Sequence, residues 1–242
     1  MPKRNEKTFV ERLGIGASVG EVLGRGHTGR RIHVGDDYRL AEAWSGLADR
    51  RDLLAHSAAN RFREEVAAVP PLHDIELRCV RGRLDNGAVR GWEDMGPPQT
   101  PHENRYNSPS QTVLYLCDSR LGVNMELCPE GRCRLLLQEY ILPLISLKLA
   151  DFSNPDLSEF VDAAFDMAES SRVSGRAGRA DFLFSQLLAD LVREAGFHGM
   201  LVPGVRGDPE RRYLNVVVFD PPTSRDWRLW SLRDSGFRLV VT

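Results

Sequence analysis

The sequence has no excess of charge, because 32 lysine and arginine residues are matched by 34 aspartate and glutamate residues, giving a formal net charge of -2 over 242 residues. A protein without a positive field is not drawn as a whole onto nucleic acid, and we expect no direct nucleic-acid binding. The longest apolar run, LLLQEYILPLISLKL, contains Gln138, Glu139 and Lys148 and is too short to cross a bilayer. The N-terminal segment lacks the apolar stretch of a secretory signal. We therefore predict a soluble cytoplasmic protein without a membrane partner.

Motifs that bind zinc or build the common hydrolase sites are also missing. The cysteines, Cys79, Cys117, Cys128 and Cys133, form no C-x-x-C pair, and no histidine lies near the closest two. We expect reduced structural thiols and no metal site. Neither a G-x-S-x-G turn nor an H-E-x-x-H helix occurs. GIGASVG, at 14–20, has one residue too many for a dinucleotide-binding loop and follows no buried strand, which indicates an ordinary loop.

The chain divides into a helical N-terminal part and a mixed α/β part. Apolar residues recur at helical intervals between residues 36 and 69, which predicts two helices that end at the prolines that follow. The later segments show either strand-like alternation or a helical apolar stripe. Strands are predicted at 75–80, 112–118, 142–152, 199–204 and 212–222, a closing hairpin at 226–232 and 237–242, and helices from 119, at 156–168 and at 181–196. We predict a helical extension at residues 1–71 and a mixed α/β domain at residues 72–242.

Three polar residues surround one predicted strand in ENRYNSPSQTVLYLCDSRLGVNMEL, at 103–127. Arg105 lies at the end of a long irregular segment, Tyr115 lies on the strand, and Glu126 lies on the helix that Ser119 caps. A loop, the strand after it and the next helix can meet around one cleft. The alternative is an exposed arginine, a half-buried sheet tyrosine and a solvated glutamate, and the spacing alone leaves both interpretations open.

The same stretch resembles the RES family, which is named for its arginine, glutamate and serine. Its members show an arginine beside an aromatic residue and an asparagine, an LYL strand, and a glutamate on the helix beyond, as in NRYNSPSQTVLYLCDSRLGVNMEL. FSQLLADLVREAGFHGMLVPGVRG resembles the family's serine-bearing helix, and RYLNVVVFDPP resembles its closing strand. The similarity covers residues 75–221. This chain has Asn104 where the family often has glycine, an insertion at 83–103, and an N-terminal part without a counterpart in a minimal member.

The resemblance implies an ADP-ribosyltransferase-like fold, a twisted sheet core with flanking helices, here preceded by a short helical N-terminal extension. It also implies a toxin that degrades NAD by cleaving the nicotinamide–ribose bond, through hydrolysis or phosphorolysis. NAD is then the substrate, inorganic phosphate is a candidate co-substrate, and no cofactor or metal is required. The expected partner is a cognate Xre-type antitoxin with a helix-turn-helix domain.

Residue roles follow from the same resemblance and suit the chemistry. Glu126 would stabilise the positive charge that builds on the ribose as nicotinamide leaves. Arg105 would hold the pyrophosphate with its bidentate fork, and Tyr115 would offer its ring to the nicotinamide and its hydroxyl to the ribose. Ser185 and Asn215 would contact substrate. The alternatives are purely structural: a serine that hydrogen-bonds to its own helix and an asparagine whose hydrogen bonds lie within the sheet.

Other interpretations stay open at this point. A protein ADP-ribosyltransferase would use the same residues with a protein acceptor, and a catalytically silent module would only bind a nucleotide or a partner. The arginines of the loop from Arg172 to Arg179 are either solvated or bind phosphate. The N-terminal helices are open to three roles: contact with a partner, self-association into a homo-oligomer, or support of the catalytic domain.

Overall fold

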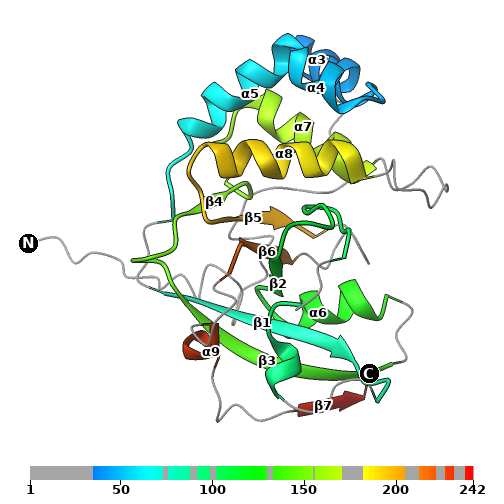
Figure 1. Cartoon of the computed structure of the whole chain (residues 1–242), viewed down its shortest axis with the longest axis vertical. Helices are drawn as coiled ribbons and strands as arrows, with labels where there is room; N and C mark the ends of the chain where they lie inside the picture. The colour runs from blue at the N-terminus through cyan, green and yellow to red at the C-terminus, as the bar shows by residue number, and fades with distance from the viewer. Residues whose placement is uncertain are drawn as a thin grey trace, which may run out of the picture.

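The computed structural model describes residues 35–72, 76–87, 92–98, 102–129, 133–154, 156–170, 182–204, 213–221, 227–231 and 238–241. The glycine-rich segment at 14–20 and the basic loop from Arg172 to Arg179 lie outside these residues. The described part confirms a mixed α/β fold in which helices flank one sheet (Figure 1).

The core of the molecule is a seven-stranded mixed sheet in the order β4-β5-β6-β2-β1-β3-β7. Only the β4–β5 pair is parallel among these neighbours. The nearly all-apolar β6 lies between β5 and β2, as expected for a strand that is covered on both faces. The strands are β1 (Glu76–Leu84), β2 (Val113–Cys117), β3 (Arg134–Pro143), β4 (Leu149–Asp151), β5 (Gly199–Pro203), β6 (Leu214–Phe219) and β7 (Arg238–Val241).

The sheet opens between two of its central strands. β1 pairs with β3 along its whole length, and β2 pairs with β6 along its whole length. β1 and β2, however, are paired only at Val80 and Cys117. The two halves of the sheet are therefore joined by this single pair and separate on either side of it.

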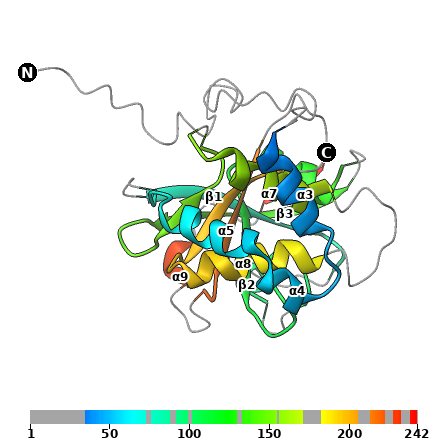
Figure 2. The same ribbon diagram turned by 90° about the horizontal axis from the view of Figure 1, so that it is seen from above.

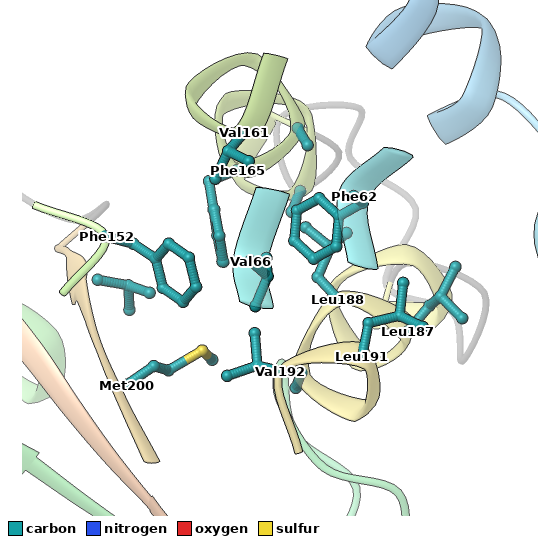
Figure 3. Close-up of a cluster of buried hydrophobic side chains, with 14 of the residues drawn as sticks. Phe62, Val66, Phe152, Val161, Phe165, Leu187, Leu188, Leu191, Val192 and Met200 are labelled. Carbon is teal, nitrogen blue, oxygen red and sulfur yellow. The ribbon is translucent and has the colours of Figure 1, made fainter. Parts of the chain in front are cut away.

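Five helices form a layer over one face of the sheet, which Figures 1 and 2 show from two sides. Figure 3 shows side chains of α5, α7 and α8 pointing toward one another and toward Phe152 and Met200 at the sheet. α6 instead packs beside β1 and β2. The helices of the layer are α3 (Asp36–Ser45), α4 (Arg50–Ala55), α5 (Ser57–Ala67), α7 (Glu159–Ser170) and α8 (Leu183–Glu194), and α6 is Arg120–Leu127.

The N-terminal helices share one apolar core with the rest of the chain. Three helices are present where two were predicted, because α4 and α5 are separate helices. His56 caps the N-terminus of α5. Trp44 is fully buried, its ring contacts Phe160 of α7 and Phe184 of α8, and its Nε1 donates to the carbonyl of Leu53 at 2.8 Å. Among the three roles considered for these helices, this packing favours support of the α/β part.

Trp44→Ala is therefore expected to destabilise the whole fold. The change removes a large buried side chain and one buried hydrogen bond, so we expect the free energy of unfolding to fall by about 3 to 5 kcal/mol. Urea unfolding measures it, with Leu229→Ala, at an 81% exposed position, as a control expected within about 0.5 kcal/mol of wild type. An equally small change for Trp44→Ala would mean that the N-terminal helices fold independently of the core.

Two of the predicted strands are wrong in part. The segment 142–152 is the end of β3, a turn in which the N–H groups of Ser146 and Leu147 donate to the carbonyl of Pro143, and the short β4. The predicted C-terminal hairpin is absent from the described residues, where Trp227–Trp230 is the short helix α9 and β7 pairs with β3 instead. The irregular segment after β1 begins later than predicted and contains a 3-10 helix, Trp92–Met95.

The cysteines differ from the expectation of four reduced thiols. Cys128 and Cys133 form a disulfide between the end of α6 and the start of β3, with Cα atoms 6.0 Å apart. The expectation is wrong for this pair, because four intervening residues let the chain return within the distance that a disulfide spans. Cys79 and Cys117 are free and buried.

Among the described helices, none is long and apolar enough to cross a membrane.

Candidate functional site

A cleft of about 300 Å³ lies where β1 and β2 separate. Its lining includes four of the five residues that the sequence singled out, namely Arg105, Tyr115, Glu126 and Asn215. A second cavity of about 350 Å³ adjoins it, because Gly82, Asn104, Tyr115 and Leu127 line both. The structure thus brings a loop, two strands and a helix together around the first cleft.

Glu126 is positioned by the start of its helix and by two hydrogen-bond donors at β6 of the same chain. Ser119 caps α6, and its hydroxyl accepts from the N–H of Gly122 at 3.1 Å, as the sequence predicted. Near the end of α6, Oε1 of Glu126 accepts from the hydroxyl of Tyr213 at 2.8 Å and from Nδ2 of Asn215 at 2.7 Å. The carboxylate is therefore held at the cleft by two hydrogen bonds to one oxygen.

Asn215 has its amide orientation set from both ends. It lies on β6 opposite Cys117 of β2, and the Cys117 thiol donates to its Oδ1 at 3.4 Å. With the oxygen turned toward the thiol, the amide nitrogen faces Glu126. Asn215 was predicted to contact substrate, and what the structure has is its hydrogen bond to the glutamate.

The Arg105 loop is fixed to α8 through backbone groups. Ser185 Oγ donates to the carbonyl of Arg105 at 2.6 Å, and Gln186 Nε2 donates to the carbonyls of Asn104 and Asn107 at 3.0 Å each. Side-chain Nδ2 of Asn107 donates within the loop to the carbonyls of residues 102, 108 and 111. The loop is therefore ordered by buried hydrogen bonds before any ligand arrives.

The Arg105 guanidinium is buried beside the cleft with unused donor capacity. The residue is only 8% exposed, and its Nη2 has no acceptor within hydrogen-bonding distance in the described part of the chain. Leaving a buried charged donor unpaired is unfavourable, so such a group is typical of a site that an anionic ligand completes.

Tyr115 uses its hydroxyl to hold the same loop. The oxygen accepts from the N–H of Tyr106 at 3.1 Å and donates to Oδ1 of Asn107 at 2.9 Å. Burial raises the pKa of Tyr115 above its ordinary value, so the phenol stays protonated. Tyr115 lines both cavities, and its hydroxyl holds the loop.

Ser185 lies behind the loop and is absent from the lining of the cleft. The residue is 1% exposed, and besides its bond to the Arg105 carbonyl its Oγ lies 3.1 Å from the carbonyl of Phe182 on its own helix. In the structure, the predicted serine positions the loop of the predicted arginine.

Two arginines of β1 were missed by the sequence analysis. Arg81 and Arg83 line the second cavity, and Nη1 of Arg81 and Nε of Arg83 are buried without an acceptor among the described residues. Burial lowers the pKa of Arg81 to about 10, which still leaves it charged at neutral pH. The available signal was two arginines at i and i+2 of a strand, which places both side chains on one face.

Asp118, between β2 and α6, has an unusual carboxyl group. The residue is buried, Ser119 Oγ donates to its Oδ1, and its Oδ2 has no partner among the described residues. Burial raises the pKa of Asp118 from an ordinary 3.8 to about 7. The folded protein therefore keeps a proton on Asp118 between these two values, while the unfolded chain releases it.

The free energy of unfolding is accordingly expected to fall as the pH rises from about 4 to about 7, since the unfolded state binds fewer protons in this window. The slope from one group is at most about 1.4 kcal/mol per pH unit. Asp118→Asn cannot ionise and should flatten this slope in urea unfolding at pH 5 and pH 8. Asp85→Asn, on an aspartate that pairs with Arg134 at 3.2 Å, is the control. A wild-type slope that survives in Asp118→Asn would contradict the assignment.

Metal ligands do not gather in the described residues, where no group of three or more His, Cys, Asp or Glu side chains could hold an ion. The charged groups that line the cleft are instead the Glu126 carboxylate and the Arg105 guanidinium, and Arg81 and Arg83 line the second cavity. Such a set suits a ligand that is anionic in one part and develops positive charge in another.

Comparison with known proteins agrees with the sequence motifs. A family model described as RES domain matches residues 75–233, which is more than half of the chain. No curated protein matches the chain.

Proposed function

The chain belongs to the RES family, and from this membership we propose that it degrades NAD by cleaving the bond between nicotinamide and ribose. The family as a whole is linked to NAD-degrading toxins that are paired with antitoxins. The observation that carries the proposal for this chain is the cleft itself, which is lined both by a carboxylate held by two hydrogen bonds and by Arg105, whose buried Nη2 lacks an acceptor among the described residues.

Glu126 is the proposed catalytic carboxylate. As the C–N bond to nicotinamide breaks, its electron pair leaves with the nicotinamide, and positive charge spreads over the ribose. A carboxylate beside the sugar stabilises that charge more strongly in the transition state than in the ground state. Two hydrogen bonds to Oε1 hold the group in place before the reaction, so little reorganisation is needed at the moment of bond cleavage.

The acceptor then forms a bond to the same ribose carbon. With water, the acceptor oxygen loses a proton and the product is ADP-ribose. With inorganic phosphate, a phosphate oxygen forms the bond and the product is ADP-ribose carrying an additional phosphate. Both reactions balance without an oxidant or a cofactor.

The arginines are the proposed sites for the pyrophosphate. Arg105 Nη2 is a buried donor at the main cleft, and Arg81 and Arg83 place further donors at the adjoining cavity. Guanidinium groups suit phosphate oxygens through charge and bidentate geometry. We assign the Tyr115 ring to the nicotinamide end, because it lines the cleft next to Glu126. Asn215 stays a proposed ribose contact, and Ser185 is assigned to holding the Arg105 loop.

The test is nicotinamide release from NAD by the purified protein, followed by chromatography with and without inorganic phosphate. We expect release in at least one condition, and the second product identifies the acceptor. Free ADP-ribose indicates hydrolysis, a phosphorylated ADP-ribose indicates phosphorolysis, and label transferred from radioactive NAD to protein indicates a protein ADP-ribosyltransferase. The same reactions are repeated with lysate protein added as a protein acceptor. Absence of nicotinamide release in all of these conditions would overturn the proposal and leave a binding module.

A further inference from the structure

Tyr213 lies just before β6, in the segment RYLNVVVFDPP that resembles the family's closing strand, and the sequence analysis assigned it no role. The residue is 2% exposed, and its hydroxyl donates to Oε1 of Glu126 at 2.8 Å. Tyr213 is not among the residues that line the cleft. The hydrogen bond to Glu126 connects Tyr213 to a residue that does line the cleft.

The tyrosine ring occupies a slot between two glycines. A Cβ atom on Gly204 would lie 2.0 Å from Cε2 and 2.1 Å from Cζ of the ring, and a Cβ on Gly122 would lie 2.9 Å from Cδ2. The N–H of Gly204 also donates to the carbonyl of Tyr213 at 2.9 Å. No larger residue fits at Gly204 without moving the ring, so the local sequence is adapted to this side chain.

The slot links the tyrosine to the helix that carries the glutamate. Gly122 is four residues before Glu126 on α6, which places both on one face of the helix. The ring thus rests against the helix one turn before the carboxylate that its hydroxyl contacts. A glutamate side chain has three rotatable bonds, and a second donor on a rigid ring restricts it further than Asn215 does alone.

We propose that Tyr213, seated between Gly122 and Gly204, is a positioning residue that fixes the Glu126 carboxylate for catalysis. The inference rests on the proposed function, because it assigns Tyr213 to the same reaction. A positioning residue acts on the rate of the chemical step and leaves substrate binding unchanged.

Tyr213→Phe removes only the hydroxyl and keeps the ring in its slot. A lost hydrogen bond to a charged group predicts that kcat for nicotinamide release falls about 10- to 100-fold. KM for NAD is expected to stay within about twofold, because the interaction involves no substrate group. Tyr38→Phe, in the helical layer, is the matched control and should change neither value. Gly204→Ala should reproduce the loss of kcat by displacing the ring.

Combination with Glu126→Gln separates positioning from a structural effect. If Tyr213 acts through Glu126, Tyr213→Phe added to Glu126→Gln lowers the single-turnover rate little further. An unchanged kcat in Tyr213→Phe, or a raised KM at constant kcat, would overturn the inference. Wild type without nicotinamide release would instead overturn the proposed function. Urea unfolding of wild type, Tyr213→Phe, Glu126→Ala and the double variant would then still measure the Tyr213–Glu126 coupling, because alanine removes the acceptor. Absence of coupling would overturn the contact itself.

Discussion

Glu126→Gln is expected to lower kcat for nicotinamide release by about 10²- to 10³-fold while the affinity for NAD changes only slightly. Glutamine keeps the shape of glutamate and loses its charge, so it no longer stabilises a positively charged ribose. Tyr213 and Asn215 can still donate to the amide oxygen, because both bonds meet a single oxygen of residue 126. The substitution therefore tests charge rather than structure.

Steady-state kinetics and an NAD titration of Glu126→Gln measure these two effects. Glu139→Gln is the matched control, since Glu139 lies on β3 and pairs with Arg120 at 2.7 Å. In cells, expression of the wild type should arrest growth and expression of Glu126→Gln should not. A variant that keeps more than about a tenth of the wild-type kcat would remove Glu126 from the role of main electrostatic group.

Arg105→Met is expected to weaken NAD binding about 10- to 100-fold, which is the effect of losing a hydrogen bond between a charged donor and a phosphate oxygen. The same change should leave the free energy of unfolding unchanged or raise it, because methionine removes a buried donor that lacks an acceptor in the described structure. The affinity for NAD is thus expected to fall while the free energy of unfolding stays the same or rises. Arg105→Lys should be intermediate, since it keeps the charge without the fork.

Calorimetric titration and urea unfolding of Arg105→Met test both halves of this expectation. Arg78→Met is the control, because Arg78 is an exposed arginine of β1 that lies 3.6 Å from Glu76. Unchanged NAD affinity in Arg105→Met would show that the buried guanidinium does not contact the substrate. A large loss of stability would show instead that Arg105 is a structural residue.

Local patterns predicted the segments that carry the site. The strand with Tyr115, the Ser119 cap and the position of Glu126 on the following helix all depend on residues close in sequence, and the structure has them as expected. The apolar stripe of α8 was equally clear, and its buried face is the one that was predicted. Arg105, Tyr115 and Glu126 all line the cleft, which is one of the two arrangements that their spacing had left open.

Features that depend on long-range pairing could not be read from the sequence. The separation of β1 from β2 follows from which strands they pair with, and no local pattern reports it. The same holds for Arg81 and Arg83, which become site residues only because that separation opens beside them. Ser185 was singled out for a substrate contact, yet its partner is a backbone carbonyl that lies 80 residues earlier.

The most direct test of the account is a structure of Glu126→Gln with NAD bound. The account predicts that NAD occupies the cleft between β1 and β2, with the nicotinamide ribose within hydrogen-bonding distance of residue 126 and the pyrophosphate on the Arg105 guanidinium. NAD bound elsewhere, or a cleft that stays empty at saturating NAD, would contradict it.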